Sequence, residues 1–323
     1  MRYRTFGRLG WQVSELGYGM WGLAGWSGSD DDTTRAALEE AVALGCNFFD
    51  TAWAYGTGRS EQFLGALVRA HPGRRLYTAT KVPPKNFTWP SRPEFTLDDV
   101  FPPDHIREYA EKSLANLGLD RVDLLQFHVW QDEWVHDDRW RRVIDDLKRE
   151  GMTEGAGISM NRWEPENGIE TLRSGAIDAV QVIYNIFDQA PEDELFPVCR
   201  DLDVAVIARV PFDEGSLTGT LTRDTRFPEG DFRRVYFGPE NLGPTMDRVD
   251  ELMPLVPRDS TLPELALRFV LSNADVTTAI PGMRRPEHVR ANIRASERGA
   301  LDPDTTTTLR SHRWDRRPSS WSL

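Results

Sequence analysis

Short apolar runs alternate with longer stretches in which apolar residues recur at helical spacing, along nearly the whole chain. The runs predict core strands, and the periodic stretches between them predict helices. The expected strands cover residues 15–19, 47–50, 76–81, 122–128, 154–159, 179–184, 204–208 and 276–280. The expected helices cover residues 31–44, 60–69, 104–117, 138–150, 166–174, 192–201, 263–272, 286–296 and 302–313.

This alternation is typical of a parallel sheet, because parallel neighbours need a crossover connection. It predicts an α/β fold, a single (β/α)8 TIM barrel that spans residues 1–323 as one domain. The alternative is an open doubly wound sheet, which usually carries a glycine-rich phosphate turn after its first strand. The glycines at 17–22 have a different spacing. Residues 2–13 predict an N-terminal β-hairpin, and a C-terminal helix and tail end the chain.

Two connections, residues 82–103 and 211–245, are long for loops between a strand and the next helix. Both follow a predicted strand, so in a barrel we expect them at the catalytic face. Loops of this length at that face are often lids or binding loops. Tolerated surface insertions are the alternative interpretation.

The composition narrows the classes of partner. The chain has 39 Lys and Arg against 51 Asp and Glu, for a formal net charge of −12. An acidic chain is a poor match for nucleic acid or an anionic membrane, so we expect neither as a partner. Two cysteines, Cys46 and Cys199, are too few for a disulfide framework and predict buried thiols in a reducing, cytoplasmic compartment. No metal-ligand spacing is visible, so no metal is expected, and the oligomeric state is left open.

Four ionisable residues stand at or just after the ends of three neighbouring predicted strands: Asp50, Tyr55, Lys81 and His128. In a barrel these strand ends converge. A lysine beside a phenol lowers the pKa of the phenol, and Asp50 would pair with Lys81 and hold it there. Neutral His128 would orient a carbonyl oxygen against Tyr55. The set is suited to proton donation to an alkoxide as it forms, as in carbonyl reduction by hydride.

Several segments resemble the aldo-keto reductase family. Residues 47–65 read NFFDTAWAYGTGRSEQFLG, which is similar to the family signature that carries the catalytic Asp and Tyr. In this family an Asp, a Tyr, a strand-end Lys and a strand-end His form the catalytic tetrad. Residues 157–161, 181–219 and 280–293 resemble further family segments. The resemblance covers essentially the whole chain and implies catalysis by Asp50, Tyr55, Lys81 and His128.

The resemblance also implies NADPH as the cofactor, bound in an extended form at the barrel mouth. Ser159, Asn161 and Gln181 would hold the nicotinamide carboxamide, Arg284 the 2′-phosphate and Asn292 the adenine. The residues expected to contact the cofactor are Gly19, Met20, Trp21, Asp50, Ser159, Asn161, Gln181, Arg209, Pro211, Phe212, Gly215, Leu217, Gly219, Ile280, Gly282, Met283, Arg284, His288 and Asn292.

Some positions depart from the family pattern. Arg209 stands where many members stack a Tyr on the nicotinamide, although a guanidinium plane can also stack. Thr220 replaces a Lys that faces the pyrophosphate in many relatives, and His288 and Ala291 also differ from the usual residues. These departures leave open whether the preference for NADPH is strict.

The substrate pocket would be lined by aromatic residues of the mouth loops, which suit an apolar or sugar-like ligand. The candidates are Trp21, Trp26, Trp53, Tyr55, Phe87, Trp89, His128 and Trp130. The expected function is NADPH-dependent reduction of an aldehyde or ketone, with the proton from Tyr55. The alternatives are the reverse oxidation of an alcohol or sugar, and a non-catalytic NADPH-binding redox sensor. The identity of the small-molecule substrate is left open.

Overall fold

A computed structural model of the protein describes residues 1–23 and 30–315. Eight parallel strands form one sheet whose spatial order follows the chain. They are β3 (Tyr18–Gly19), β4 (Phe48–Asp50), β5 (Tyr77–Val82), β6 (Val122–Phe127), β7 (Thr153–Ser159), β8 (Ala179–Ile183), β9 (Ala205–Arg209) and β10 (Thr278–Ala279). Parallel bridges from Leu16 to Ala279 and from Gly19 to Gly282 join the first and last strands. The predicted (β/α)8 barrel is therefore confirmed, and the open sheet is excluded.

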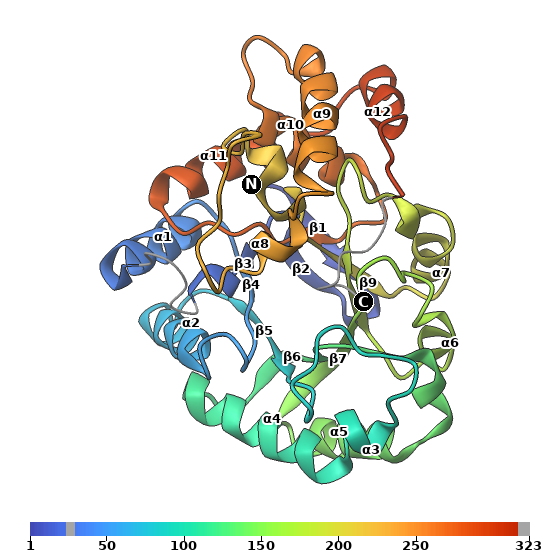
Figure 1. Ribbon diagram of the computed structural model, residues 1–323. Coiled ribbons are helices and arrows are strands. Elements are labelled where there is room, and N and C mark those ends of the chain that lie inside the picture. The colour runs from blue at the N-terminus through green and yellow to red at the C-terminus, as the bar shows by residue number, and fades with distance from the viewer. Residues whose placement is uncertain (24–29, 316–323) are drawn as a thin grey trace.

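Helices surround the strands (Figure 1). They are α1 (Asp31–Ala43), α2 (Arg59–Ala70), α3 (Leu97–Val100), α4 (Pro103–Leu117), α5 (Arg139–Arg149), α6 (Ile169–Arg173), α7 (Leu195–Asp201), α8 (Arg233–Tyr236), α9 (Leu242–Leu252), α10 (Leu262–Ser272), α11 (Pro286–Arg298) and α12 (Pro303–Arg310). Their ends follow local chemistry. The Asp30 carboxylate accepts a hydrogen bond from the Thr33 amide at the start of α1. Gly118, in the left-handed region, ends α4.

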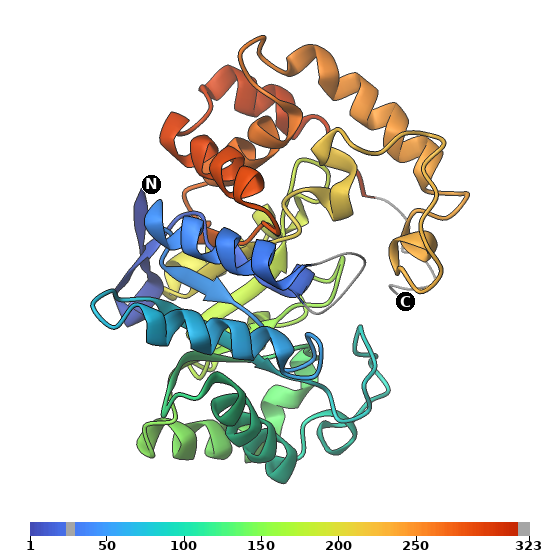
Figure 2. The same cartoon turned by 90° about the vertical axis from the view of Figure 1, so that its left-hand side faces the viewer.

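The N-terminal hairpin also forms as predicted, from β1 (Tyr3–Phe6) and β2 (Trp11–Ser14). Its inner side closes the end of the barrel at which the strands begin. Phe6 stacks on Phe48 and on Trp11, and Trp11 stacks on Tyr77, with ring centroids 5.1–5.4 Å apart. The interior at this end is therefore filled by aromatic packing. Figure 2 shows the hairpin in dark blue at one end of the barrel and the two long loops at the opposite end.

Trp130 was expected in the substrate pocket, and the structure corrects this. Its side chain has no exposed surface and packs against Phe127, Trp134 and Trp140 in the hydrophobic core. Its indole N–H donates to the Thr171 hydroxyl at 2.8 Å. Trp134 and Trp140 come from the connection after β6 and from α5, so Trp130 lies outside the barrel wall, among the helices.

Several boundaries differ from the sequence prediction, and three of them change the long loops or the last strand. Helix α9 begins at Leu242, inside the predicted 211–245 loop. The adjacent Gly243 and Pro244 favour a loop in the sequence prediction, although proline is well accepted in the first turn of a helix. Helix α3 lies within the predicted 82–103 loop. The last barrel strand shrinks from 276–280 to two residues, yet the amides of Thr277 and Ile280 still donate to carbonyls of β9.

At the C-terminus, Trp314 packs back onto the barrel. Its ring contacts Phe187, and the Arg248 guanidinium lies 4.6 Å from the ring centroid. The substrate contact predicted for Trp26 falls outside the described residues. Both cysteines are buried, as predicted.

Candidate active site

The strands carry the predicted tetrad to one end of the barrel. Asp50 is the last residue of β4, Lys81 lies near the end of β5, and His128 directly follows β6. The Lys81 ammonium donates to Asp50 Oδ1 at 2.5 Å and to the Thr51 carbonyl at 2.8 Å. Both side chains of the ion pair are at most 2 % exposed, so solvent does not screen it. Lys81 is therefore fixed in position by its partners.

A tight turn after β4 places Tyr55 beside this pair. The Tyr55 amide donates to the Ala52 carbonyl, and the Gly58 amide donates to the Trp53 carbonyl. Gly58 has a φ of 87°, and a Cβ there would lie 2.1 Å from the Asn116 side chain, so the turn requires glycine. Lys81 Nζ lies 5.2 Å from the centroid of the Tyr55 ring.

The His128 ring packs edge-on against Tyr55 and Trp89, with centroids 5.7 and 5.5 Å away. Its Nδ1 is buried and has no hydrogen-bond partner among residues 1–23 and 30–315. Burial, together with the charges of Lys81 and Arg209, holds the pKa of His128 well below its ordinary value. The imidazole is therefore neutral at physiological pH, as the predicted role requires.

The phenol behaves differently from the prediction. Lys81 and Arg209 both favour the phenolate, but burial outweighs them and raises the pKa of Tyr55 above its ordinary value. The expected depression of this pKa is thus wrong for the protein alone. Tyr55 is fully protonated near neutral pH, which is the state that a proton donor needs.

Gln126 is a site residue that the sequence analysis missed. Its amide nitrogen donates to Asp50 Oδ2 at 2.9 Å, and the residue is buried in β6. Gln181 donates to the same carboxylate oxygen, also at 2.9 Å. The signal was available, because side chains alternate along a strand and Gln126 lies two residues before His128. Leu124, two residues further back, packs inside the barrel.

Arg209 lies at the end of β9 and has an unexpected neighbour. Its guanidinium donates to the Met160 carbonyl at 2.9 Å. Burial and repulsion from Arg162 lower the pKa of Arg209 to about 10. Arg162 is itself buried, lies 4.2 Å from the Tyr236 ring centroid and pairs with Glu214 at 3.2 Å. No pattern in residues 157–161 pointed to this second arginine.

Asn161 does not have the amide free for a nicotinamide. Its Oδ1 accepts from the Ser91 amide, and its Nδ2 donates to the Trp130 carbonyl at 3.1 Å and to Glu164 at 3.0 Å. These bonds tie the 82–103 loop to the barrel. The structure therefore gives Asn161 a structural role, and Ser159 and Gln181 remain as the predicted partners of the carboxamide.

The remaining predicted cofactor contacts fall into two groups. Met20, Leu217 and Met283 have no exposed surface in this structure, backbone included. The others lie in three segments: in and just after β3, in and around the 3-10 helix η5 (Asp213–Thr218), and from the end of β10 into α11. They are Gly19, Trp21, Pro211, Phe212, Gly215, Gly219, Ile280, Gly282, Arg284, His288 and Asn292.

Two arginines precede the 13-residue helix α11. Arg284 is exposed, and its side chain lies over Gly22, where a Cβ would come within 2.8 Å of it. Arg285 lies 3.7 Å from Glu287. A helix N-terminus with adjacent arginines suits a phosphate group.

Aromatic residues of the mouth loops form a wall beside the tetrad. Trp53 contacts Phe87, Phe87 contacts Trp89, and Trp89 contacts His128. Phe87 is 51 % exposed, so this wall faces solvent in the absence of a ligand. Trp21, 40 % exposed, packs edge-on against Phe232 of the second long loop. The first long loop thus brings aromatic surface to the tetrad, and the second contacts the segment that follows β3.

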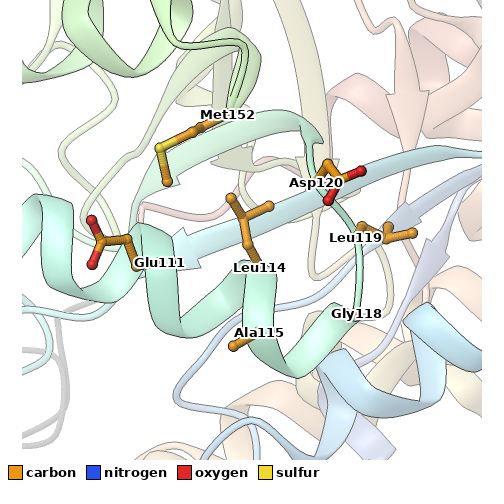
Figure 3. A pocket seen from close by; sticks show the side chains of 7 residues that line it. All are labelled: Glu111, Leu114, Ala115, Gly118, Leu119, Asp120 and Met152. Carbon is orange, nitrogen blue, oxygen red and sulfur yellow. The ribbon is translucent and has the colours of Figure 1, made fainter.

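A surface depression elsewhere lies away from this chemistry. Figure 3 shows it beside α4, lined by Glu111, Leu114, Ala115, Gly118, Leu119, Asp120 and Met152. The connections that line it lead from helices into β6 and β7, so it lies near the start of those strands, away from the tetrad. Within the described ranges, no cluster of His, Cys, Asp and Glu could hold a metal ion, and no helix is long and apolar enough to cross a bilayer.

A sequence model of the Aldo/keto reductase family matches residues 15–313. The chain belongs to this family. It is 31% identical over 309 residues to the NADH-specific methylglyoxal reductase of Escherichia coli (strain K12), covering 91% of this chain and 93% of that relative. It is 30% identical over 300 residues to an NADP(+) aldo-keto reductase of Schizosaccharomyces pombe, with 88% and 84% covered.

Solved structures of aldo/keto reductases agree with the barrel. The glycerol dehydrogenase of Gluconobacter oxydans has a TM-score of 0.79 at 26% identity, covering 96% of this chain and 94% of its own. An aldo-keto reductase of Bacillus halodurans, in its holo form, has a TM-score of 0.76 at 28% identity over all of both chains. Members of this family are NAD(P)H-dependent oxidoreductases, and so is this protein.

Proposed function

We propose that this aldo/keto reductase reduces an aldehyde or ketone to an alcohol, with NADPH as its preferred cofactor and Tyr55 as the proton donor. The observation that carries the proposal is the buried Lys81–Asp50 pair beside a protonated Tyr55 and a neutral His128. A carbonyl that becomes an alkoxide needs a nearby acid and a neutral hydrogen-bond donor. Both are present at the same end of the barrel.

The residues at the mouth fit a nicotinamide dinucleotide. Oε1 of Gln181 accepts no hydrogen bond from a described residue and is a ready partner for a carboxamide N–H. Arg284 and Arg285, before α11, suit the phosphate of the adenosine end. The reduced nicotinamide supplies the hydride when it is bound. Ser159 and Gln181 would orient its ring, and Arg209 would support it with a guanidinium plane.

The protein's own groups handle the proton. Tyr55 Oη would give its proton to the carbonyl oxygen, and the Lys81 ammonium would stabilise the phenolate that results. Asp50 holds Lys81 in place through the ion pair. His128, kept neutral by burial and nearby positive charge, would donate a hydrogen bond that orients the carbonyl. The aromatic wall of Trp53, Phe87 and Trp89 would exclude water from an apolar substrate.

Alcohol oxidation is the second candidate, because a structural neighbour is named a glycerol dehydrogenase. A panel of aldehydes, ketones, polyols and sugars, assayed in both directions with NADH and NADPH, tests both candidates. We expect reduction of aldehydes to have the highest kcat/KM. A higher kcat/KM for alcohols would reverse the proposed direction. Tight cofactor binding without turnover of any compound would favour the redox sensor.

A further inference from the structure

The buried amides of Gln126 and Gln181 form a closed set of hydrogen bonds with Asp50. Gln181 Nε2 donates to Asp50 Oδ2 at 2.9 Å and to Gln126 Oε1 at 3.2 Å. Gln126 Nε2 donates to the same Asp50 oxygen at 2.9 Å. Gln126 and Gln181 are 1 % and 2 % exposed, respectively. Both N–H groups of Gln181 are therefore used inside the protein.

This arrangement determines which end of the Gln181 amide faces the barrel mouth. An amide has two N–H donors and one carbonyl acceptor, so Oε1 is the polar atom that remains. If the amide turned over, Oε1 would face the Asp50 carboxylate and the Gln126 carbonyl. Both are acceptors, and a buried acceptor without a donor is unfavourable. The set is stable only with Oε1 turned toward the mouth.

We propose that Gln126 is a positioning residue that fixes Gln181 as a hydrogen-bond acceptor, so that the site selects the carboxamide N–H of a nicotinamide. The inference rests on the proposed function. Gln126 touches neither cofactor nor substrate in this role. It acts by supplying the acceptor for one Gln181 N–H and by sharing Asp50 Oδ2, and it thereby links the cofactor site to the catalytic carboxylate.

Binding of two dinucleotides tests this role without any turnover. NADP⁺ carries the carboxamide, and its 3-acetylpyridine analogue has a methyl group in place of the N–H₂. Dissociation constants come from quenching of protein fluorescence. One selected hydrogen bond should make NADP⁺ bind the wild type about three- to tenfold more tightly than the analogue. In Gln126→Met, which keeps the size but removes both hydrogen-bonding groups, the ratio should fall toward one.

Two further variants separate positioning from packing. Gln126→Glu keeps an oxygen that accepts from Gln181 but places its other oxygen against Asp50 Oδ2, so the wild-type ratio should be kept only where the new carboxyl is protonated and donates to Asp50. Gln181→Met removes the acceptor itself, so adding Gln126→Met to it should change the ratio no further. Additive effects of the two Met substitutions would overturn the proposal.

A fragment provides the control for folding. Adenosine 2′,5′-bisphosphate lacks the nicotinamide and should bind wild type and Gln126→Met equally. If Gln126→Met does not fold, Gln126→Leu, which also lacks both hydrogen-bonding groups, takes its place, and a wild-type ratio in that variant would overturn the proposal. An unchanged ratio in a folded Gln126→Met overturns this inference alone. Failure of the wild type to bind either NADP⁺ or NAD⁺ would instead overturn the proposed function.

Discussion

The two ends of this barrel are built from the same strands but from opposite kinds of side chain. On β4, Phe48 faces the hairpin, and Asp50, two residues on, reaches the mouth. On β5, Ala79 is followed at the same spacing by Lys81. Side chains two positions apart share a face of the strand. On each of these strands, an apolar residue that packs near the hairpin is therefore followed two positions later by a buried charged residue. The hairpin end adds stability, whereas the mouth holds charge that burial makes unfavourable.

The hairpin end should account for the largest change in stability. Trp11 is 6 % exposed, lies between Phe6 and Tyr77, and donates its indole N–H to Glu154. Trp11→Ala should lower the free energy of unfolding by about 3–5 kcal/mol, as for other large buried residues. Urea unfolding measures this loss. The kcat of the folded variant, measured in the cold, should stay near that of wild type.

A matched substitution at the mouth sharpens the contrast. Trp53 is only partly buried, so Trp53→Ala should cost less stability and should raise KM for the substrate. A Trp11→Ala variant that remains fully folded but loses kcat would show that the hairpin end contributes to the chemistry. That result would contradict the division between the two ends.

At the mouth the expected effect falls on the rate and not on stability. Tyr55→Phe removes one hydroxyl and should reduce turnover by roughly 10² or more, the usual contribution of a positioned acid. Cofactor affinity and the unfolding midpoint should change little. Because burial raises the pKa of Tyr55, we also expect wild-type reduction to show no loss through phenol ionisation between pH 7 and its ordinary pKa of 10.0. Near-wild-type kcat in the variant would remove Tyr55 from its role.

The barrel and the tetrad were predictable because both follow from alternation along strands. Asp50, Lys81 and His128 stand at the ends of strongly apolar runs, where a charged residue is conspicuous. The same alternation would have identified Gln126. Gln126 was not predicted because the pattern at the strand ends singled out ionisable residues, and the glutamine side chain is neutral.

Other residues could not be placed from the chain alone. Trp130 lies only two residues beyond His128, but its partners Trp134, Trp140 and Thr171 come from three different elements. Asn161 is satisfied by Ser91, which is seventy residues away. Contacts between residues so far apart leave no local sequence pattern. The fold and the ionisable residues at strand ends can therefore be predicted from the sequence, whereas the contacts of loop residues cannot.

The cofactor's phosphate gives a smaller, selective effect at the mouth. A bidentate charged contact is worth about 1.5–3 kcal/mol, so Arg284→Ala should weaken NADPH binding roughly tenfold to a hundredfold and barely change NADH binding. Arg285→Ala is the matched control. Arg285 lies 3.7 Å from Glu287, so we expect a smaller loss. Dissociation constants of NADPH and NADH for wild type, Arg284→Ala and Arg285→Ala measure these losses.

The cofactor preference does not follow from the relatives, since one is named as NADH-specific and another carries NADP(+) in its name. An equal loss for both cofactors in Arg284→Ala would mean that the side chain supports the mouth without recognising the 2′-phosphate. A wild type that prefers NADH would contradict the proposed preference directly.

The smallest expected effect is the cost in stability of keeping His128 neutral. In the folded protein its pKa is well below the 6.5 of an unfolded chain, because of burial and the charges of Lys81 and Arg209. Below pH 6.5 the unfolded chain therefore binds more protons, and stability falls as the pH falls. The contribution of His128 to this slope is at most about 1.4 kcal/mol per pH unit.

His128→Asn removes it, so the unfolding free energies of wild type and variant should converge or cross between pH 7 and 5. His105 also has a lowered pKa, but it is present in both proteins and cancels from the difference. If the unfolding free energies of wild type and variant run parallel over this pH range, His128 binds protons equally in the folded and unfolded states. Keeping it neutral at the mouth would then cost no stability.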